Sequence, residues 1–339
     1  MHPNETRIPA HALTRRDFLR RTASTALVMS SVGAFLAACQ RREEEPGGSA
    51  MEVGFARPGS PVQLPLFDDN PPMGDGLSPE AGPLRIFNWN DYIYKKVLKR
   101  FESEVGVEIE YDQFTSMAEA ISKIQNDAVD FDLFFPTADH LRSLVLAKKV
   151  QPLNRTYLSN FESNTWPALK DPFYDRGSRY TTPYLVWKSG VGYRRDLIQT
   201  EPSGDFASAF GVLWDPRYEG EVGVLDEYRD TMSMTLLRNG VGDVNTEDAD
   251  EIRAAGDALL DLSAAVNVNV NPPDYQALGE GVHTLRYAWS GNLNYTRYYL
   301  PEGTSPDVLG FYYPPGGVVG NDMIVVARDA QSPVLAHMF

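Results

Sequence analysis

Aromatic and amide side chains gather where a short apolar run ends, in the stretch "LRIFNWNDY" from Leu84 to Tyr92. Trp89 and Tyr92 are three residues apart across a predicted strand-to-helix junction, with Asn90 between them, so both rings could face one cleft. An aromatic face attracts an ammonium group by about 0.5–2 kcal/mol and packs well against methylenes. A core Trp beside a Tyr at the rim would give the same pattern, and these residues alone favour that interpretation slightly.

Two acids form a second candidate for chemistry. In "LDEYRD", Glu227 and Asp230 are spaced i, i+3 at a predicted helix start and therefore share one face. Two carboxylates in that arrangement could hold one ammonium group. Acids in a first helical turn also offset the helix dipole, and this structural role is favoured when the pair is taken alone.

Four residues at three other junctions are weaker candidates. Trp289 stands in "YAWSGN" at the end of a predicted strand, and Asp322 stands in "GGVVGNDMIVV" before an apolar one. Thr137 and Asp139 stand in "FFPTAD". A Trp in a strand is usually a core residue, and Asp139 is typical of a first-turn helix acid.

The sequence carries no motif typical of an enzyme. The five histidines are isolated from one another, at His2, His11, His140, His283 and His337. No His pair has metal-ligand spacing, and there is neither a Gly-rich phosphate loop nor a nucleophile elbow. We therefore expect no enzyme activity, no cofactor and no metal.

The elements that position these residues follow a β-α-β-α-β-α order between residues 84 and 149. This order predicts a parallel sheet with helices on its faces, in which ligands bind beyond the carboxyl ends of the strands. The 339 residues suffice for two lobes. Two extended runs, "YTTPYLVWKSGVGYRRDL" and "NDMIVVARDA", could cross between them.

The amino terminus predicts export. Arg15 and Arg16 precede an uncharged, largely apolar run from Ala23 to Ala38, which is short for a spanning helix. The paired arginines resemble a twin-arginine signal, and "LAAC" resembles a lipobox that ends at the only cysteine, Cys39. We expect residues 1–38 to be a signal peptide and Cys39 to be acylated. A plain secretory signal with an unrelated cysteine is the alternative.

Residues 39–82 are rich in Pro, Gly and acids and predict a flexible linker between lipid and domain, although "VQLPLF" could pack on the domain. At its other end the chain stops at Phe339 inside an apolar helical run without a stop signal, which is typical of a truncated reading frame.

The formal charge of −15 limits the kinds of partner that we expect the protein to bind. Before Cys39 there are five Arg and two acids, a charge of +3, so the remainder carries −18. Nucleic acid is excluded as a partner because its phosphates require Lys and Arg. We expect a monomer that attracts cations.

Together these motifs, in this order from Leu84 to about Ala327, resemble the polyamine-binding proteins of ABC transporters, of the spermidine/putrescine-binding type. The resemblance implies a two-lobed α/β fold of the type II periplasmic-binding-protein kind, with a hinge of crossing strands. It places lobe 1 at residues 83–186 and 320–339, truncated at its C-terminus, and lobe 2 at 187–319.

The resemblance also implies residue roles. It implies that aromatics cover the ligand's methylenes, at Trp89, Tyr92 and Trp289. It implies acids that meet its amino groups, at Glu227, Asp230 and Asp322. It implies polar contacts at Asn90 and Asn271, with Thr137 and Asp139 standing where the family has Ser and an aromatic.

One departure concerns Gly320, which stands where the family often has a Trp. The family's last contacts lie beyond Phe339.

We therefore expect a lipid-anchored protein, at the periplasm or the outer face of the cell membrane, that captures putrescine or spermidine for an ABC permease. Another cation is the alternative ligand: a ferric ion bound through Tyr298 and Tyr299, or a quaternary amine in an aromatic cage. A secreted glycoside hydrolase that uses two carboxylates is the alternative from a different class.

Overall fold

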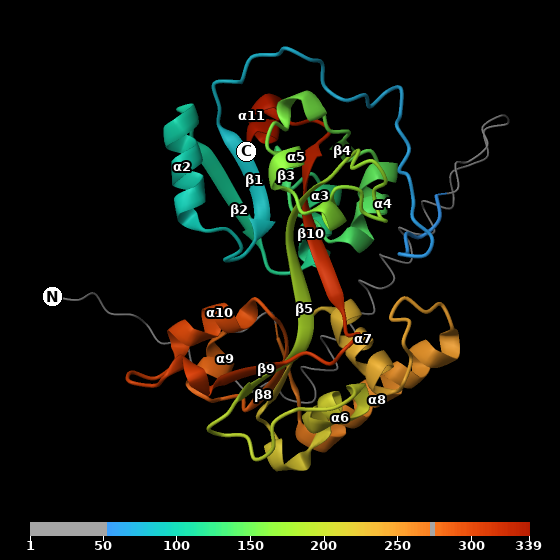
Figure 1. The fold of residues 1–339 in the computed structure, drawn as a ribbon, viewed down its shortest axis with the longest axis vertical. Helices are drawn as coiled ribbons and strands as arrows, with labels where there is room; N and C mark the ends of the chain where they lie inside the picture. Colours follow the sequence, from blue (N-terminus) through green and yellow to red (C-terminus); the bar gives the residue numbers. More distant parts are fainter. Residues whose placement is uncertain (1–52, 272–274) are drawn as a thin grey trace. The chain divides into compact units, whose positions relative to one another are not determined.

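The computed structural model describes residues 53–271 and 275–339 (Figure 1). The predicted signal peptide, the predicted acylation site at Cys39 and the first part of the predicted linker lie outside these residues. Among the described helices, none has the length and apolar character needed to cross a membrane.

Ten strands in the described residues form one hydrogen-bonded sheet. Their bounds are β1 (Leu84–Trp89), β2 (Ile109–Phe114), β3 (Leu133–Phe134), β4 (Val150–Gln151), β5 (Thr182–Arg194), β6 (Val222–Leu225), β7 (Asn269–Asn271), β8 (Leu285–Trp289), β9 (Leu309–Tyr312) and β10 (Val319–Ala327).

Helices connect most of these strands. The α-helices are α2 (Lys95–Val105), α3 (Met117–Gln125), α4 (Ala138–Leu146), α5 (Phe161–Asn164), α6 (Phe206–Gly211), α7 (Tyr228–Arg238), α8 (Ala249–Val266), α9 (Tyr275–Glu280), α10 (Asn292–Thr296) and α11 (Pro333–Met338). Short 3-10 turns are η1 (Arg155–Tyr157), η2 (Pro167–Leu169), η3 (Val212–Trp214), η4 (Pro216–Tyr218), η5 (Arg297–Tyr299) and η6 (Pro306–Val308).

The order of the strands is β2-β1-β3-β10-β5-β8-β6-β7, with β4 paired to β10 and β9 paired to β5. Pairs β1–β2 and β1–β3 are parallel, as the β-α-β pattern of residues 84–149 predicts. Pairs β6–β7 and β6–β8 are also parallel. Strands β5 and β10 pair antiparallel with each other and also reach partners on either side, as Figure 1 shows. These are the two extended runs expected to cross.

Two separate hydrophobic cores lie on either side of this crossing. The first contains buried side chains from Val53 to Tyr180 and again from Met323 to Ala336, and we call the part of the chain around it lobe 1. The second contains buried side chains from Val191 to Tyr287, and it defines lobe 2. Trp289 packs against both cores. The fold is therefore the predicted two-lobed α/β architecture.

Local sequence signals explain the elements that lead into the site. Helix α2 ends at Gly106, whose φ of 79° is in the left-handed region that favours glycine. Helix α3 begins after Ser116, whose Oγ accepts the backbone N–H of Glu119 at 3.2 Å. Both the glycine stop and the serine cap are as predicted.

The segment 53–82 differs from the predicted flexible linker. Leu64 in "VQLPLF" is fully buried in the first core, and Val53 joins the same core. Tyr180 donates a hydrogen bond to the carbonyl of Pro65 at 2.5 Å, and Asn70 donates to the carbonyl of Val150 at 2.9 Å. A few apolar anchors and backbone acceptors are enough to hold a Pro-rich chain extended against lobe 1.

Candidate ligand-binding site

Asp322 lies at the crossing of β5 and β10 and is only 2% exposed. Tyr92 donates its hydroxyl to one carboxylate oxygen of Asp322, and Trp187 donates its indole N–H to the other at 3.1 Å. Burial raises the pKa of Asp322 to about 7, although both donors lower it. Thr137 forms a β-bridge with Asp322, so the end of β3 meets β10 at this point.

Asp230 lies in the first turn of α7, in lobe 2. The hydroxyl of Ser189 donates to its Oδ1 at 2.7 Å. Burial raises the pKa of Asp230, and Ser189 opposes that rise. The indole N–H of Trp289 also lowers this pKa from nearby, although its geometry falls short of a hydrogen bond.

Glu227 occupies the residue before α7, but its side chain makes no capping bond to that helix. Instead its Oε1 accepts the backbone N–H of Met117, the first residue of α3 in lobe 1, at 3.2 Å. Burial raises the pKa of Glu227 to about 7, and the charge of Asp230 adds to the rise. The carboxyl group of Glu227 therefore connects lobe 2 to lobe 1 through this hydrogen bond.

Asp139, unlike the three acids above, lies within ion-pair distance of two basic side chains. It accepts a hydrogen bond from Thr137 at 2.6 Å, and its Oδ2 lies 3.3 Å from Nδ1 of His140 and 3.2 Å from Nε of Arg229. Burial opposes its ionisation, but His140, Arg229 and Thr137 together hold the pKa of Asp139 below its usual range. The same contact raises the pKa of His140 against the effect of its burial.

The four carboxyl groups lie close enough to affect one another. The charges of Asp230 and Asp139 both raise the pKa of Asp322 and that of Glu227. Asp139 and Asp322 come from the lobe 1 side and the crossing strand, whereas Glu227 and Asp230 come from lobe 2. The structure thus brings the predicted acids into one region of negative potential.

Aromatic rings border these acids. The ring centroids of Trp89 and Trp289 are 6.0 Å apart, those of Trp289 and Trp187 are 5.7 Å apart, and those of Trp89 and Tyr92 are 6.2 Å apart. Trp89 is itself 7% exposed and donates its indole N–H to the carbonyl of Phe135 at 3.0 Å. It therefore has the core role that the sequence also allowed, with Trp289 against its edge.

Asn90 and Asn271, which were predicted to make polar contacts with the ligand, form hydrogen bonds with neighbouring residues. Asn90 is exposed, and its amide donates to Asp91 at 3.2 Å. Asn271 ends β7, where its side-chain oxygen accepts from Arg286 at 2.9 Å and its backbone carbonyl accepts from the N–H of Asp226.

The sequence interpretation missed four residues of this region: Ser189, Trp187, His140 and Arg229. Ser189 and Trp187 are two apart on β5, so period-2 alternation in the long extended run could have identified their shared face. Arg229 lies inside the acidic turn "LDEYRD", where charge alone does not predict a pairing with Asp139. His140 directly follows Asp139. The search for histidine pairs did not consider a carboxylate as its partner.

At Gly320, where the family that the sequence resembles often has a Trp, the structure places the ring of another Trp. Gly320 on β10 pairs with Trp187 on β5, and a Cβ at residue 320 would overlap the six-membered ring of that Trp. The space above Gly320 is therefore filled by an aromatic ring from the neighbouring strand.

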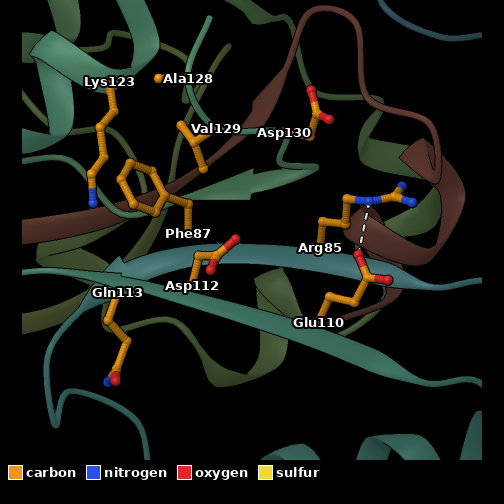
Figure 2. Close-up of a pocket in the computed structure, with 9 residues that line it drawn as sticks. All are labelled: Arg85, Phe87, Glu110, Asp112, Gln113, Lys123, Ala128, Val129 and Asp130. Atoms are coloured by element: carbon orange, nitrogen blue, oxygen red, sulfur yellow. Dashed lines mark ion pairs between the residues drawn. The ribbon is translucent and has the colours of Figure 1, made fainter.

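Two hollows in the described part of the chain are lined by residues other than the predicted site residues. Figure 2 shows one of about 310 Å³ beside β1 and β2, where Arg85 pairs with Glu110 at 3.0 Å and Lys123 and Asp130 also contribute to the lining. Another, of about 570 Å³, lies between η1, β5 and the C-terminal residue Phe339.

Comparison with known proteins finds several relatives that are named as polyamine-binding proteins. The chain is 26% identical to the putrescine/cadaverine-binding protein of Pseudomonas aeruginosa over 273 residues, which is 78% of this chain and 75% of that protein. It is 25% identical to the spermidine/putrescine-binding periplasmic protein of Escherichia coli over 262 residues, which is 77% of this chain and 72% of that protein.

Solved structures agree on the fold. A putative spermidine/putrescine ABC transporter protein from Listeria monocytogenes matches with a TM-score of 0.65 at 23% identity, covering 75% of each chain. A Treponema pallidum lipoprotein matches with a TM-score of 0.66 at 18% identity, covering 75% of this chain and 77% of its own. The family model for bacterial extracellular solute-binding proteins matches residues 96–338. The chain therefore belongs to the bacterial extracellular solute-binding protein family, whose members bind solutes and are not enzymes.

Proposed function

We propose that this protein captures a linear polyamine, putrescine or spermidine, and delivers it to the permease of an ABC importer. The observation that carries the proposal is the group of four carboxyl groups, Asp139, Glu227, Asp230 and Asp322, drawn from both lobes and the crossing strand and bordered by aromatic rings. The names of the relatives, which include putrescine, cadaverine and spermidine, support the same ligand class.

The physical chemistry suits a slender dication or trication. Burial disfavours ionisation of Asp322 and Glu227, and an ammonium group within hydrogen-bond distance reverses that effect. Charge-assisted hydrogen bonds from ammonium groups are stronger than neutral ones. Methylenes between the ammonium groups would pack on Trp289 and its neighbours. Exclusion of water strengthens each charge interaction.

Selection among polyamines would follow from the spacing of the acids. A ligand whose ammonium groups do not match that spacing leaves a buried carboxylate without a partner, which costs several kcal/mol. Solutes without a positive charge are rejected for the same reason.

The proposal extends to the cell surface. Export through the twin-arginine-like segment and acylation at Cys39 would hold the protein beside its permease, with the polar residues between Cys39 and Val53 as the tether. Globomycin treatment of cells that express the full chain tests this part: the unprocessed precursor should accumulate in the wild type, whereas processing of a Cys39→Ser variant should not respond to globomycin.

Thermal stabilisation by a panel of putrescine, spermidine, agmatine and betaine tests the ligand class. A ligand at a hundredfold excess over its dissociation constant adds about 2.7 kcal/mol of stability, a readily measured shift. We expect stabilisation by putrescine or spermidine and none by betaine. Stabilisation by betaine alone would favour a quaternary amine instead.

The ferric-ion alternative receives less support from the geometry. Tyr298 and Tyr299 are 69% and 40% exposed, and the Tyr298 hydroxyl accepts a hydrogen bond from its neighbour Arg297 at 2.8 Å. A charge-transfer colour on addition of iron would revive that alternative.

A further inference from the structure

Trp187 lies on β5, at a position for which the sequence analysis predicts no role. It is half-buried, and its ring lies across β10 over Gly320, the residue with which it pairs in register. An added Cβ at residue 320 would overlap that ring, so the absence of a side chain there is what admits the indole. Gly320 and Trp187 are therefore a fitted pair across the two crossing strands.

The polar edge of the same ring points to Asp322. The indole N–H donates to Oδ1 of Asp322 at 3.1 Å, while Tyr92 donates to the other oxygen. The opposite neighbour of Trp187 is Trp289, with ring centroids 5.7 Å apart. One side chain thus contacts an acid and an aromatic ring of the candidate site.

Strand β5 repeats this contact two residues later. Side chains at i and i+2 of a strand share a face, and Ser189 donates to Asp230 at 2.7 Å. Between them, Lys188 is exposed and its ammonium group lies 4.5 Å from the Tyr313 ring centroid, away from the acids. One face of β5 therefore holds two of the four carboxyl groups, Asp322 through Trp187 and Asp230 through Ser189.

We propose that Trp187 is a specificity-determining residue of the ligand site, which supplies an aromatic wall from β5 and fixes Asp322 for an amino group of the ligand. This inference rests on the proposed function. The ring covers the methylene next to the amino group, and the N–H keeps the Asp322 carboxylate oriented without neutralising its charge.

The N–H and the ring make separable contributions. Trp187→Ala removes both, whereas Trp187→Phe keeps an aromatic plane and removes the donor to Asp322. Gly320→Val leaves Trp187 intact but displaces its ring, because the new side chain needs the same space. Trp166→Ala is the matched control, since Trp166 is 69% exposed and lies outside the candidate site.

Calorimetric titration of the full-length exported protein with putrescine and with spermidine gives the test, after thermal melts show that each variant is folded. We expect Trp187→Ala and Gly320→Val to weaken binding by about tenfold or more, a loss of about 1.4 kcal/mol, and Trp166→Ala to bind as the wild type. Trp187→Phe should fall in between. It should also move the pH at which affinity is half-lost upward, because Asp322 has lost a donor that favours its ionised form.

The outcomes separate this inference from the proposed function. Wild-type binding of a polyamine together with unchanged binding by Trp187→Ala and Trp187→Phe would overturn the inference and leave the function standing. If Trp187→Ala does not fold, Trp187→Phe and its pH profile decide. If the wild type binds no polyamine, the proposed function fails and this inference fails with it.

Discussion

Asp322 is a buried acid and Glu227 a half-buried one, and their environment raises the pKa of each to about 7. Burial is the main cause for both, and neighbouring carboxylates add to it. A carboxyl group with a pKa raised by folding favours the folded state when it is protonated and loses that advantage as the pH rises through the folded pKa. The ligand site is therefore a source of instability at neutral pH and above.

Removing one of these charges should stabilise the ligand-free protein and weaken binding. For Asp322→Asn we expect a higher melting temperature than the wild type at pH 8 but not at pH 4.5, where the native Asp is already protonated. The stability gain at pH 8 is on the order of a few kcal/mol. Calorimetric scans at the two pH values, with the exposed substitution Asp329→Asn as control, measure it. Equal gains at both pH values would contradict the assigned cause.

Polyamine binding should release protons near neutral pH. The ammonium groups bind carboxylates, so acids that are partly protonated at pH 6.5 must ionise, and the affinity should fall as the pH drops below about 7. Titrations in buffers of different ionisation enthalpy count the protons. Constant affinity from pH 5.5 to 8 with no proton release would mean that these two acids do not meet the ligand.

The elements that hold the site depend on a few buried polar anchors. Asp132, 1% exposed, accepts the backbone N–H groups of Arg85, Gln331 and Ser332 at 2.7–2.9 Å. It thereby ties β1 to the segment between β10 and α11. This anchor holds the amino end of β1, the strand that carries Trp89 at its other end, in place beside the segment that follows β10.

Asp132→Asn should destabilise lobe 1 by about 2–4 kcal/mol, because an amide nitrogen replaces one acceptor and leaves a buried N–H without a partner. Asp130→Asn, two residues away and exposed, is the matched control and should change stability little. Urea unfolding measures both. A loss below about 0.5 kcal/mol for Asp132→Asn would show that the anchor is dispensable.

Elements with strong periodicity were predictable from the sequence, whereas short pairings were not. The repeated β-α pattern, the Gly106 stop and the Ser116 cap predicted the parallel part of lobe 1, and two long extended runs predicted the crossing strands. The strands β4 and β7, of two and three residues, have no period to detect and exist because partners lie beside them. Trp187 was missed for a similar reason: its role depends on the glycine opposite it on another strand.

At the scale of the whole molecule, both lobes meet around the acids and are connected through β5 and β10. Glu227 reaches the N–H of Met117, and Arg229 pairs with Asp139, so contacts between the lobes lie at the site itself. A further bridge lies outside the site, where Arg57 contacts Asp243 at 2.6 Å and Glu247 at 3.2 Å. Hinge bending at the crossing strands would break these contacts together.

Arg57→Ala should weaken polyamine binding by no more than about fivefold, because exposed ion pairs contribute little and act here only on the population of the closed form. Arg217→Ala, which removes the pairing with Asp215 within lobe 2, is the control and should leave affinity unchanged. Calorimetric titration compares them. A loss as large as that expected for Asp230→Asn would mean that the N-terminal segment belongs to the ligand site.

The most direct test of the central claim is calorimetric titration of the wild type and Asp230→Asn with putrescine and spermidine. Asp230 suits the test better than Trp89, whose indole is part of the first core. The account predicts one binding site per chain in the wild type and at least a tenfold weaker affinity, about 1.4 kcal/mol, in Asp230→Asn. Absence of polyamine binding in the wild type, or equal affinity in the two proteins, would contradict it.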